Sequence, residues 1–259
     1  MLQHNDQTRN HAIEIANIAM AAARGYFRGQ LGIEFKPDES PVTQADRAVE
    51  ALVRDYLNKH CPEDGIFGEE HGIEGADKDH MWIIDPIDGT RSFLSGHPLF
   101  GFLLSHTSHG IADIGIIGMP ALGELMIGQK DVGTVMNGQE ARASGQQDLA
   151  KAILYVNDSD KVFRDHPEIF GRLMRAGQTR RQGHDCYPHA LVAMGYADAV
   201  VDYDLHPYDY LALSVVIEAA GGVITDWQGN PLTLKSGTTD VITAATPALH
   251  ADLVELVNG

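Results

Sequence analysis

Two aspartates lie three residues apart directly after an apolar stretch, in the segment WIIDPIDGT that covers residues 82–90. Asp85 follows the apolar run. Asp88 lies in the turn that comes next, and a proline and Gly89 make this turn rigid. We expect this turn to direct both carboxylates and the Ile87 carbonyl oxygen to one side. Such oxygen ligands suit hard cations like Mg²⁺, and a shared carboxylate can hold two cations close together.

The same turn offers the backbone amides of Gly89 and Thr90, which can bind a phosphate oxygen. Taken alone, however, the segment also fits a plain β-turn with an aspartate cap. Further acids bear on this choice: Glu69 and Glu70 occur upstream in GEE, and Asp209 occurs downstream at the start of a helical pattern. Each has an ordinary alternative, a solvated loop for GEE and a helix N-cap for Asp209. Spacing alone does not choose among the downstream aspartates Asp198, Asp202, Asp204, Asp209 and Asp226.

The composition limits the partners that this chain can attract. Its 259 residues are 44% hydrophobic, and 36 Asp and Glu against 19 Lys and Arg give a formal net charge of −17. Long-range electrostatics therefore repel nucleic acid and anionic membrane surfaces, and we expect neither as a partner. Only two cysteines occur, which indicates no disulfide framework. The polar amino terminus lacks a signal-peptide pattern, so we expect a cytoplasmic protein.

The elements that must position these residues change character along the chain. Helical spacing of apolar residues predicts one helix over residues 11–27 and another after Thr43. Short apolar runs separated by glycine, proline and asparagine then indicate an antiparallel or mixed sheet. Further on, helices and strands alternate, which is typical of α/β layers. The pattern over residues 209–220 predicts a strongly amphipathic helix that ends at two glycines.

A polar segment over residues 137–147 is the best candidate for a boundary between two halves of the chain. We expect an N-terminal α+β half, residues 1–140, that carries the metal-binding loops. The C-terminal α/β half, residues 141–259, would supply the elements of the substrate pocket.

GEE, WIIDPIDGT and PYDYLAL ending in EAAGG occur in this order and closely resemble the inositol monophosphatase-like superfamily of magnesium-dependent, lithium-sensitive phosphatases. The resemblance covers most of the chain, from about Lys36 to Gly229, and the DPIDGT element is specific. It implies an α/β fold of stacked layers, usually described as an αβαβα sandwich. It also implies an enzyme that forms a homodimer and hydrolyses a small phosphate ester.

Carried over to the matching positions, the resemblance implies two principal Mg²⁺ sites. Glu69, Asp85 and the Ile87 carbonyl would hold one ion, and Asp85, Asp88 and Asp209 would hold the second. A third, weaker ion would contact Glu69 through water. The acidic pocket would thereby become a receptor for a phosphate anion, which suits phosphate monoester hydrolysis.

The resemblance also implies catalytic roles for Glu69, Asp46 and Thr90. Thr90, paired with Asp46 of the PVTQAD segment, would orient and deprotonate the nucleophilic water that the metal binds. Glu70 would support the cluster without binding the metal itself. Placing the water opposite the leaving oxygen is the protein's share of the catalysis.

The segment RRQGHDCYPH and the later PYD resemble the histidinol-phosphate phosphatase branch, so we expect histidinol phosphate as the substrate. Its ammonium and imidazole call for carboxylates and aromatic faces, which Asp185, Asp202, Tyr187 and Tyr208 can provide. Arg181 would contact the phosphate or hold Asp185. The substrate-binding set is then Gly89, Thr90, Arg181, Asp185, Asp202 and Asp209. Three plainer roles stay open: a helix cap for Asp185, a core position for Tyr208 and a surface cation for Arg181.

Two positions depart from the pattern of that branch. His184 replaces a glycine, and Pro188 and His189 stand where a small residue and an aromatic are common. Either change can reshape the leaving-group site. Inositol 1-phosphate or another small sugar or nucleotide phosphate is therefore the alternative substrate, and a non-catalytic metal-binding protein of the same fold is the alternative of another class.

Overall fold

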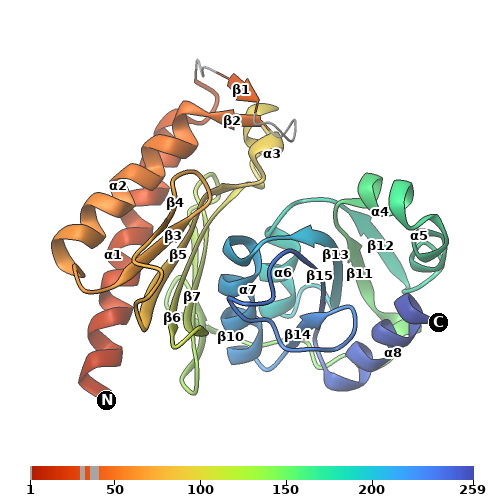
Figure 1. The fold of residues 1–259 in the computed structure, drawn as a ribbon. Helices are drawn as coiled ribbons and strands as arrows, with labels where there is room; N and C mark the ends of the chain where they lie inside the picture. Colours follow the sequence, from red (N-terminus) through yellow and green to blue (C-terminus); the bar gives the residue numbers. More distant parts are fainter. Residues whose placement is uncertain (1, 30–32, 36–40) are drawn as a thin grey trace.

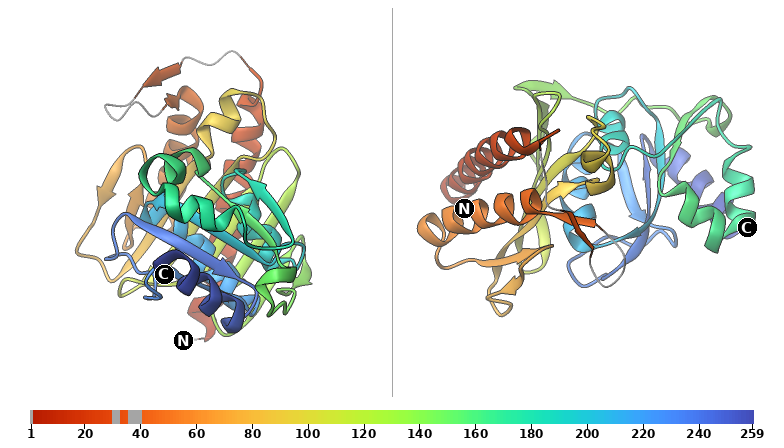
Figure 2. Two further views of the ribbon diagram at one scale, coloured as in Figure 1. Left: turned by 90° about the vertical axis from the view of Figure 1, so that its right-hand side faces the viewer. Right: turned by 90° about the horizontal axis from the view of Figure 1, so that it is seen from above.

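Helices and sheets alternate in five layers across the molecule, as Figures 1 and 2 show. The computed structural model describes residues 2–29, 33–35 and 41–259. The outer layer beside the first sheet consists of α1 (Leu2–Tyr26) and α2 (Gln44–His60). The layer between the two sheets consists of α6 (Tyr187–Ala193) and α7 (Pro207–Ala219). The outer layer beside the second sheet consists of α4 (Ser159–Asp165), α5 (Pro167–Leu173) and α8 (Pro247–Asn258). The predicted αβαβα sandwich is thus confirmed.

The first sheet has eight strands in the order β10-β9-β8-β7-β6-β5-β3-β4. All neighbours run antiparallel except β3 and β5, so the predicted mixed sheet is confirmed. The strands are β3 (Gly65–Gly68), β4 (Gly72–Glu74), β5 (His80–Asp88), β6 (Gly101–Ser108), β7 (Ile111–Met119), β8 (Glu124–Gln129), β9 (Gly133–Met136) and β10 (Gln139–Ala141).

The second sheet has five strands in the order β12-β11-β13-β15-β14. They are β11 (Ile153–Val156), β12 (Thr179–Gln182), β13 (Ala199–Leu205), β14 (Val223–Asp226) and β15 (Thr239–Ala244). The smaller elements are β1 (Ile33–Phe35), which pairs with β2 (Pro41–Thr43), the short helix α3 (Thr90–Leu94) and a 3₁₀ turn, η1 (Leu149–Lys151). Division of the chain after residue 140 stays a prediction, although β10 ends at Ala141 and the second sheet begins twelve residues later.

The first helix begins earlier than its apolar pattern predicts. It starts at Leu2 rather than near residue 11, and its buried stripe runs from Ala12 to Ala23. Its first turns are rich in polar residues, so hydrophobic periodicity carries little signal there. The helix expected after Thr43 is confirmed as α2. None of the described helices is long and apolar enough to cross a membrane.

The helix predicted as strongly amphipathic is instead buried on nearly all sides. Between the two sheets α7 must present apolar side chains to both, and nine of its thirteen residues are buried. Its backbone also lies directly on the first sheet. A Cβ atom on Gly128 would come within 2.5 Å of the Val216 Cα atom, and one on Gly115 would overlap the Ala212 carbonyl oxygen.

Candidate active site

Strand β5 carries both aspartates of the DPID segment, because it continues to Asp88 instead of ending at Asp85 as the sequence predicts. Asp85 lies opposite Leu103 and Asp88 opposite Gly101, so the strand contains one extra residue, a β-bulge. Residues three apart on a regular strand face opposite sides. The bulge brings both carboxylates to the same side, and the Ile87 N–H donates to Asp85 Oδ1 over 3.0 Å.

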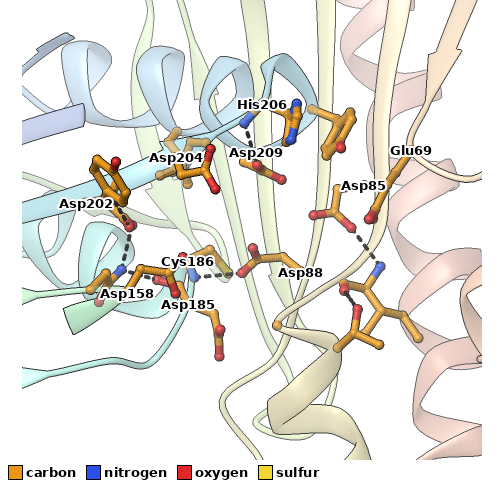
Figure 3. A pocket seen from close by; sticks show the side chains of 18 of the residues that line it. Glu69, Asp85, Asp88, Asp158, Asp185, Cys186, Asp202, Asp204, His206 and Asp209 are labelled. Atoms are coloured by element: carbon orange, nitrogen blue, oxygen red, sulfur yellow. Dashed lines mark hydrogen bonds between the residues drawn. The ribbon is translucent and has the colours of Figure 1, made fainter. Parts of the chain in front are cut away.

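Asp209 reaches the same place from the first turn of α7. The carboxylate oxygens of Asp85, Asp88 and Asp209 include one from each residue within 4.8 Å of the others. Figure 3 shows these side chains facing one another, with Glu69 beside them. The residue that caps α7 is His206, so the N-cap alternative for Asp209 is wrong. Asp209 Oδ2 accepts the His206 N–H over 2.7 Å, which fixes its direction.

Asp85, Asp88, Asp209 and Glu69 are here called the carboxylate cluster. The electrostatics of its three aspartates favour protonation when no cation is present. Burial, followed by the charges of neighbouring carboxylates, raises the pKa of Asp85 and of Asp209 well above the ordinary value. Burial and the charge of Asp185 raise the pKa of Asp88 to about 8, although the Cys186 N–H donates to Asp88 Oδ2 and opposes the shift.

Carboxylates crowded in this way are stabilised in their charged form by a cation among them. Oxygen-only ligands are those that hard divalent cations prefer. The donor set of this cluster therefore fits a divalent metal ion. Among the described residues, Asp85, Asp88 and Asp209 form the only group of three potential metal-ligating side chains that lie this close together.

Thr90 lies between two acceptors at the start of α3. Its hydroxyl Oγ1 is 3.3 Å from Asp46 Oδ1 and 3.2 Å from the Ile87 carbonyl oxygen. Asp46 is buried on α2, so its carboxylate is held away from bulk water. The structure thus brings together the predicted pair of Thr90 and Asp46.

The turn between β5 and α3 requires glycine. Gly89 caps α3 with φ of 79°, a left-handed conformation, and a Cβ atom there would lie 2.5 Å from the Asp185 carboxylate. Asp185 in turn accepts a hydrogen bond from Ser92 Oγ over 2.6 Å. Burial is the main cause that raises the pKa of Asp185, to about 6. The two halves of the chain meet at this contact.

A cavity of about 430 Å³ opens above the carboxylate cluster. Asp158, Asp185, Asp202 and Asp204 lie on the side of the cavity away from Glu69 and Asp85 (Figure 3). Together with Lys161, which also lines the cavity and pairs with two of them, they are here called the opposite wall. The acids of the opposite wall have side-chain partners. Asp202 Oδ2 accepts from Asn157 Nδ2 over 2.7 Å, and Lys161 Nζ lies 2.7 Å from Asp158 and 3.2 Å from Asp204.

Most of the predicted site residues line this cavity. They are Glu69, Asp85, Ile87, Asp88, Gly89, Thr90, Asp185, Asp202 and Asp209. Asp185 is not a helix cap, because Cys186 precedes the first residue of α6. Tyr208 is half-buried and lines the cavity, whereas Tyr187 does not line it.

Three predicted residues are not part of the lining: Asp46, which contacts Thr90 from α2, Arg181 and Glu70. Arg181 is exposed on β12, an edge strand whose four side chains all face solvent, and it is not part of the cavity lining. The surface-cation alternative describes it better. Glu70 lies outside the lining too, and its backbone N–H donates to Glu50 Oε2 over 2.7 Å.

Sequence reasoning missed several residues of the site, namely Glu50, Asn157, Asp158, Lys161 and His206. The strand-like AILYVN segment offered a signal for two of them, because ligands collect at the carboxyl ends of strands in α/β layers. No pattern marked Glu50, whose role depends on a loop twenty residues away.

Comparison with known proteins identifies the family. Residues 4–259 match the model described as the inositol monophosphatase family. The chain belongs to this family. The phosphatase fold predicted from the sequence is therefore confirmed, and this member of the family carries an acidic group that can bind a metal.

Three relatives illustrate the range of this phosphatase family. A histidinol-phosphatase of Chlorobaculum parvum is 37% identical over 84% of this chain and 85% of its own length. The chloroplastic bifunctional phosphatase IMPL2 of Arabidopsis thaliana is 35% identical over 89% of this chain and 67% of its own. The solved inositol monophosphatase of Zymomonas mobilis is 34% identical, with a TM-score of 0.88 and 98% of each chain covered.

Proposed function

We propose that this phosphatase hydrolyses histidinol phosphate to histidinol and phosphate, with Mg²⁺ bound in the carboxylate cluster. The observation that carries the substrate assignment is the opposite wall, where four aspartates and one lysine line the cavity and Lys161 pairs with only two of the aspartates, Asp158 and Asp204. An ammonium group on the leaving alcohol gains charge-assisted hydrogen bonds there, whereas a neutral sugar alcohol does not. The identity with histidinol-phosphatases of Chlorobaculum parvum and Mycobacterium tuberculosis, 37% and 32%, supports the same substrate.

The proposal assigns the metal ligands by position. Glu69, Asp85 and the Ile87 carbonyl would hold one Mg²⁺, while Asp85, Asp88 and Asp209 would hold a second. A third ion would sit near Glu69. When bound, these ions lower the pKa of water and neutralise the charge of the phosphate.

The residues around the cluster would then transfer one proton and orient the phosphate. A water molecule beside Thr90 can give its proton to Oγ1 while the hydroxyl passes its own proton to Asp46 Oδ1, 3.3 Å away. The Ile87 carbonyl oxygen, 3.2 Å from Oγ1, is the alternative acceptor for the same hydroxyl proton. The amides of Gly89 and Thr90 would orient the phosphate. Asp185 and Asp202 would face the leaving group.

Phosphate release on a matched panel tests the substrate. Histidinol phosphate, inositol 1-phosphate, fructose 1,6-bisphosphate and adenosine 3′,5′-bisphosphate would be compared with and without Mg²⁺. We expect the highest kcat/KM for histidinol phosphate, no release without Mg²⁺ and none from the Asp85→Asn variant. Faster release from inositol 1-phosphate would reject the substrate assignment and leave the phosphatase chemistry intact.

Inositol 1-phosphate is the second candidate because of the likeness to the Zymomonas mobilis inositol monophosphatase over 98% of both chains. A non-catalytic role is a further outcome of the panel. The Nus factor SuhB of Escherichia coli, 32% identical over 73% of this chain, is a relative that is named as a Nus factor and not as an enzyme. Absence of phosphate release from every ester in the presence of Mg²⁺ would favour that role.

A further inference from the structure

We propose that Glu50 is a positioning residue for the metal ligand Glu69, and that helix α2 sets the spacing of the two loops that meet at the carboxylate cluster. The role of Glu69 as a ligand rests on the proposed function. The role of Glu50 rests on contacts of the loop backbone that do not depend on the substrate.

The Glu50 carboxylate is fully buried and accepts two backbone hydrogen bonds from the loop after β3. Its Oε2 accepts the Glu70 N–H over 2.7 Å, and its Oε1 accepts the His71 N–H over 3.2 Å. Bonds from a carboxylate to amides are of the strong, charge-assisted kind. The two amides that follow Glu69 are therefore tied to α2.

The same carboxylate also lies against the residue that precedes Glu69. A Cβ atom on Gly68 would overlap Glu50 Oε1, so only glycine allows the strand to approach the carboxylate this closely. The Glu69 N–H itself donates to the Ile84 carbonyl oxygen over 3.1 Å. Glu50 thus contacts the residue before Glu69 and the residue after it, while the neighbouring strand β5 binds the Glu69 backbone itself.

Arg54, one helical turn further along α2, contacts both Glu50 and the same loop. Its Nε donates to Glu50 Oε1 over 2.8 Å, and its Nη2 donates to the Gly72 carbonyl oxygen over 2.5 Å. A buried carboxylate requires a partner of this kind, because an unpaired buried charge is strongly destabilising. Arg54 therefore gives the Glu50 carboxylate a partner within the protein and anchors the end of the same loop.

Asp46, Glu50 and Arg54 follow one another at intervals of four residues, so they lie on one face of α2. Asp46 contacts Thr90 after β5, while Glu50 holds the loop after β3. One helical turn, about 6 Å of rise, separates the two attachment points. Figure 1 shows α2 beside β3 and β4, with α3 near its first turn. The helix works as a spacer between the two loops.

The Glu50→Gln variant tests the proposal, because it keeps the size of the side chain and removes its charge. We expect Mg²⁺ affinity measured by calorimetry to fall about ten- to a hundredfold. We also expect faster hydrogen exchange at the Glu70 and His71 amides in the absence of metal. Asp55→Asn is the matched control, because it removes the same charge from an exposed position of the same helix.

Unchanged Mg²⁺ affinity and unchanged amide exchange in a folded Glu50→Gln protein would overturn the proposal. If that variant does not fold, the Arg54→Gln variant tests the proposal instead. It leaves the Glu50 carboxylate in place and removes the hydrogen bond to the Gly72 carbonyl oxygen. Mg²⁺ affinity and amide exchange are then measured in the same way. A wild-type chain that binds no Mg²⁺ would reject the proposed function, while the exchange of the two amides would still decide whether Glu50 holds the loop.

Discussion

The two sides of the cavity differ in how their acids are satisfied. In the carboxylate cluster, Asp85, Asp88 and Asp209 each accept a backbone N–H. In the part of the chain that the structure describes, no lysine or arginine forms an ion pair with these three residues. On the opposite wall, by contrast, Lys161 bridges two aspartates.

Among the described residues, this difference separates carboxylates that have no side-chain cation beside them from carboxylates that already have side-chain partners within the protein. Burial and the neighbouring carboxylates raise the pKa values of these three aspartates, and the backbone hydrogen bonds to Asp88 and Asp209 oppose that rise without cancelling it. Asp202 on the opposite wall is instead held by Asn157 and by His189, whose Nε2 lies 3.0 Å away. Substitutions on the two sides should therefore have different consequences.

Removing a carboxylate from the cluster should have the largest effect. We expect Asp85→Asn and Asp209→Asn to lower kcat/KM about a thousandfold or more, since several kcal/mol of metal-dependent stabilisation is lost. Both variants should still fold without metal, because the remaining crowded, buried carboxyl groups can bind protons and become neutral. Phosphate release and circular dichroism measure both effects. Asp226→Asn, at the last residue of β14, is the control and should keep full activity.

Substitution of Thr90 should have the next largest effect. We expect Thr90→Ala to lower kcat about a hundredfold with little change in KM, because proton transfer contributes at least that much. Thr90→Ser keeps the hydroxyl and should retain most of the activity. Steady-state kinetics would contradict the relay from Thr90 to Asp46 if the alanine variant kept its kcat.

On the opposite wall, Asp185→Asn should change the preference for one phosphate ester over another more than the rate of hydrolysis. We expect KM for histidinol phosphate to rise about tenfold, the value of one charge-assisted hydrogen bond, while kinetics on a neutral ester stay the same. Comparison of KM on the two esters is the measurement. An equal loss on both would mean that Asp185 acts through Gly89, which it touches, and not on the leaving group.

The smallest expected effect is on stability as a function of pH. A carboxyl group whose pKa rises on folding stabilises the protein fully below its ordinary pKa, and that contribution is lost as the pH rises toward the raised value. For Asp88 this window runs from 3.8 to about 8. Without metal, Tm should fall by a few °C across it, and less in Asp88→Asn. Thermal melts with Mg²⁺ should show no such fall.

The sequence was sufficient to predict the residues of the cluster but not the geometry that joins them. Asp85 and Asp88 belong to one local motif, and its residue types already indicate a metal site. The β-bulge that turns both to one side depends on pairing with β6, which lies outside the motif. The amphipathic pattern expected of α7 was wrong because a second sheet covers its other face.

The opposite wall was harder to predict because its members come from separate elements. Lys161 reaches Asp204 only because β11 and β13 run side by side in parallel, which no short motif encodes. Arg181 was assigned to the site from the resemblance, but its place on an edge strand directs it to solvent. Glu50 carries no signal at all, since a glutamate in a helix is usually exposed.

The close seating of α7 on the first sheet has a consequence for the durability of the site. The helix backbone rests on Gly115 and Gly128 without side chains between them. Main-chain contacts with β7 and β8 therefore set the distance between α7, which carries Asp209, and the first sheet, and substitutions among the surrounding apolar side chains should change it little. A single methyl group at either glycine would lift the helix and open the cluster. The geometry of the carboxylate cluster therefore depends on backbone packing, whereas the opposite wall can change through single side-chain substitutions.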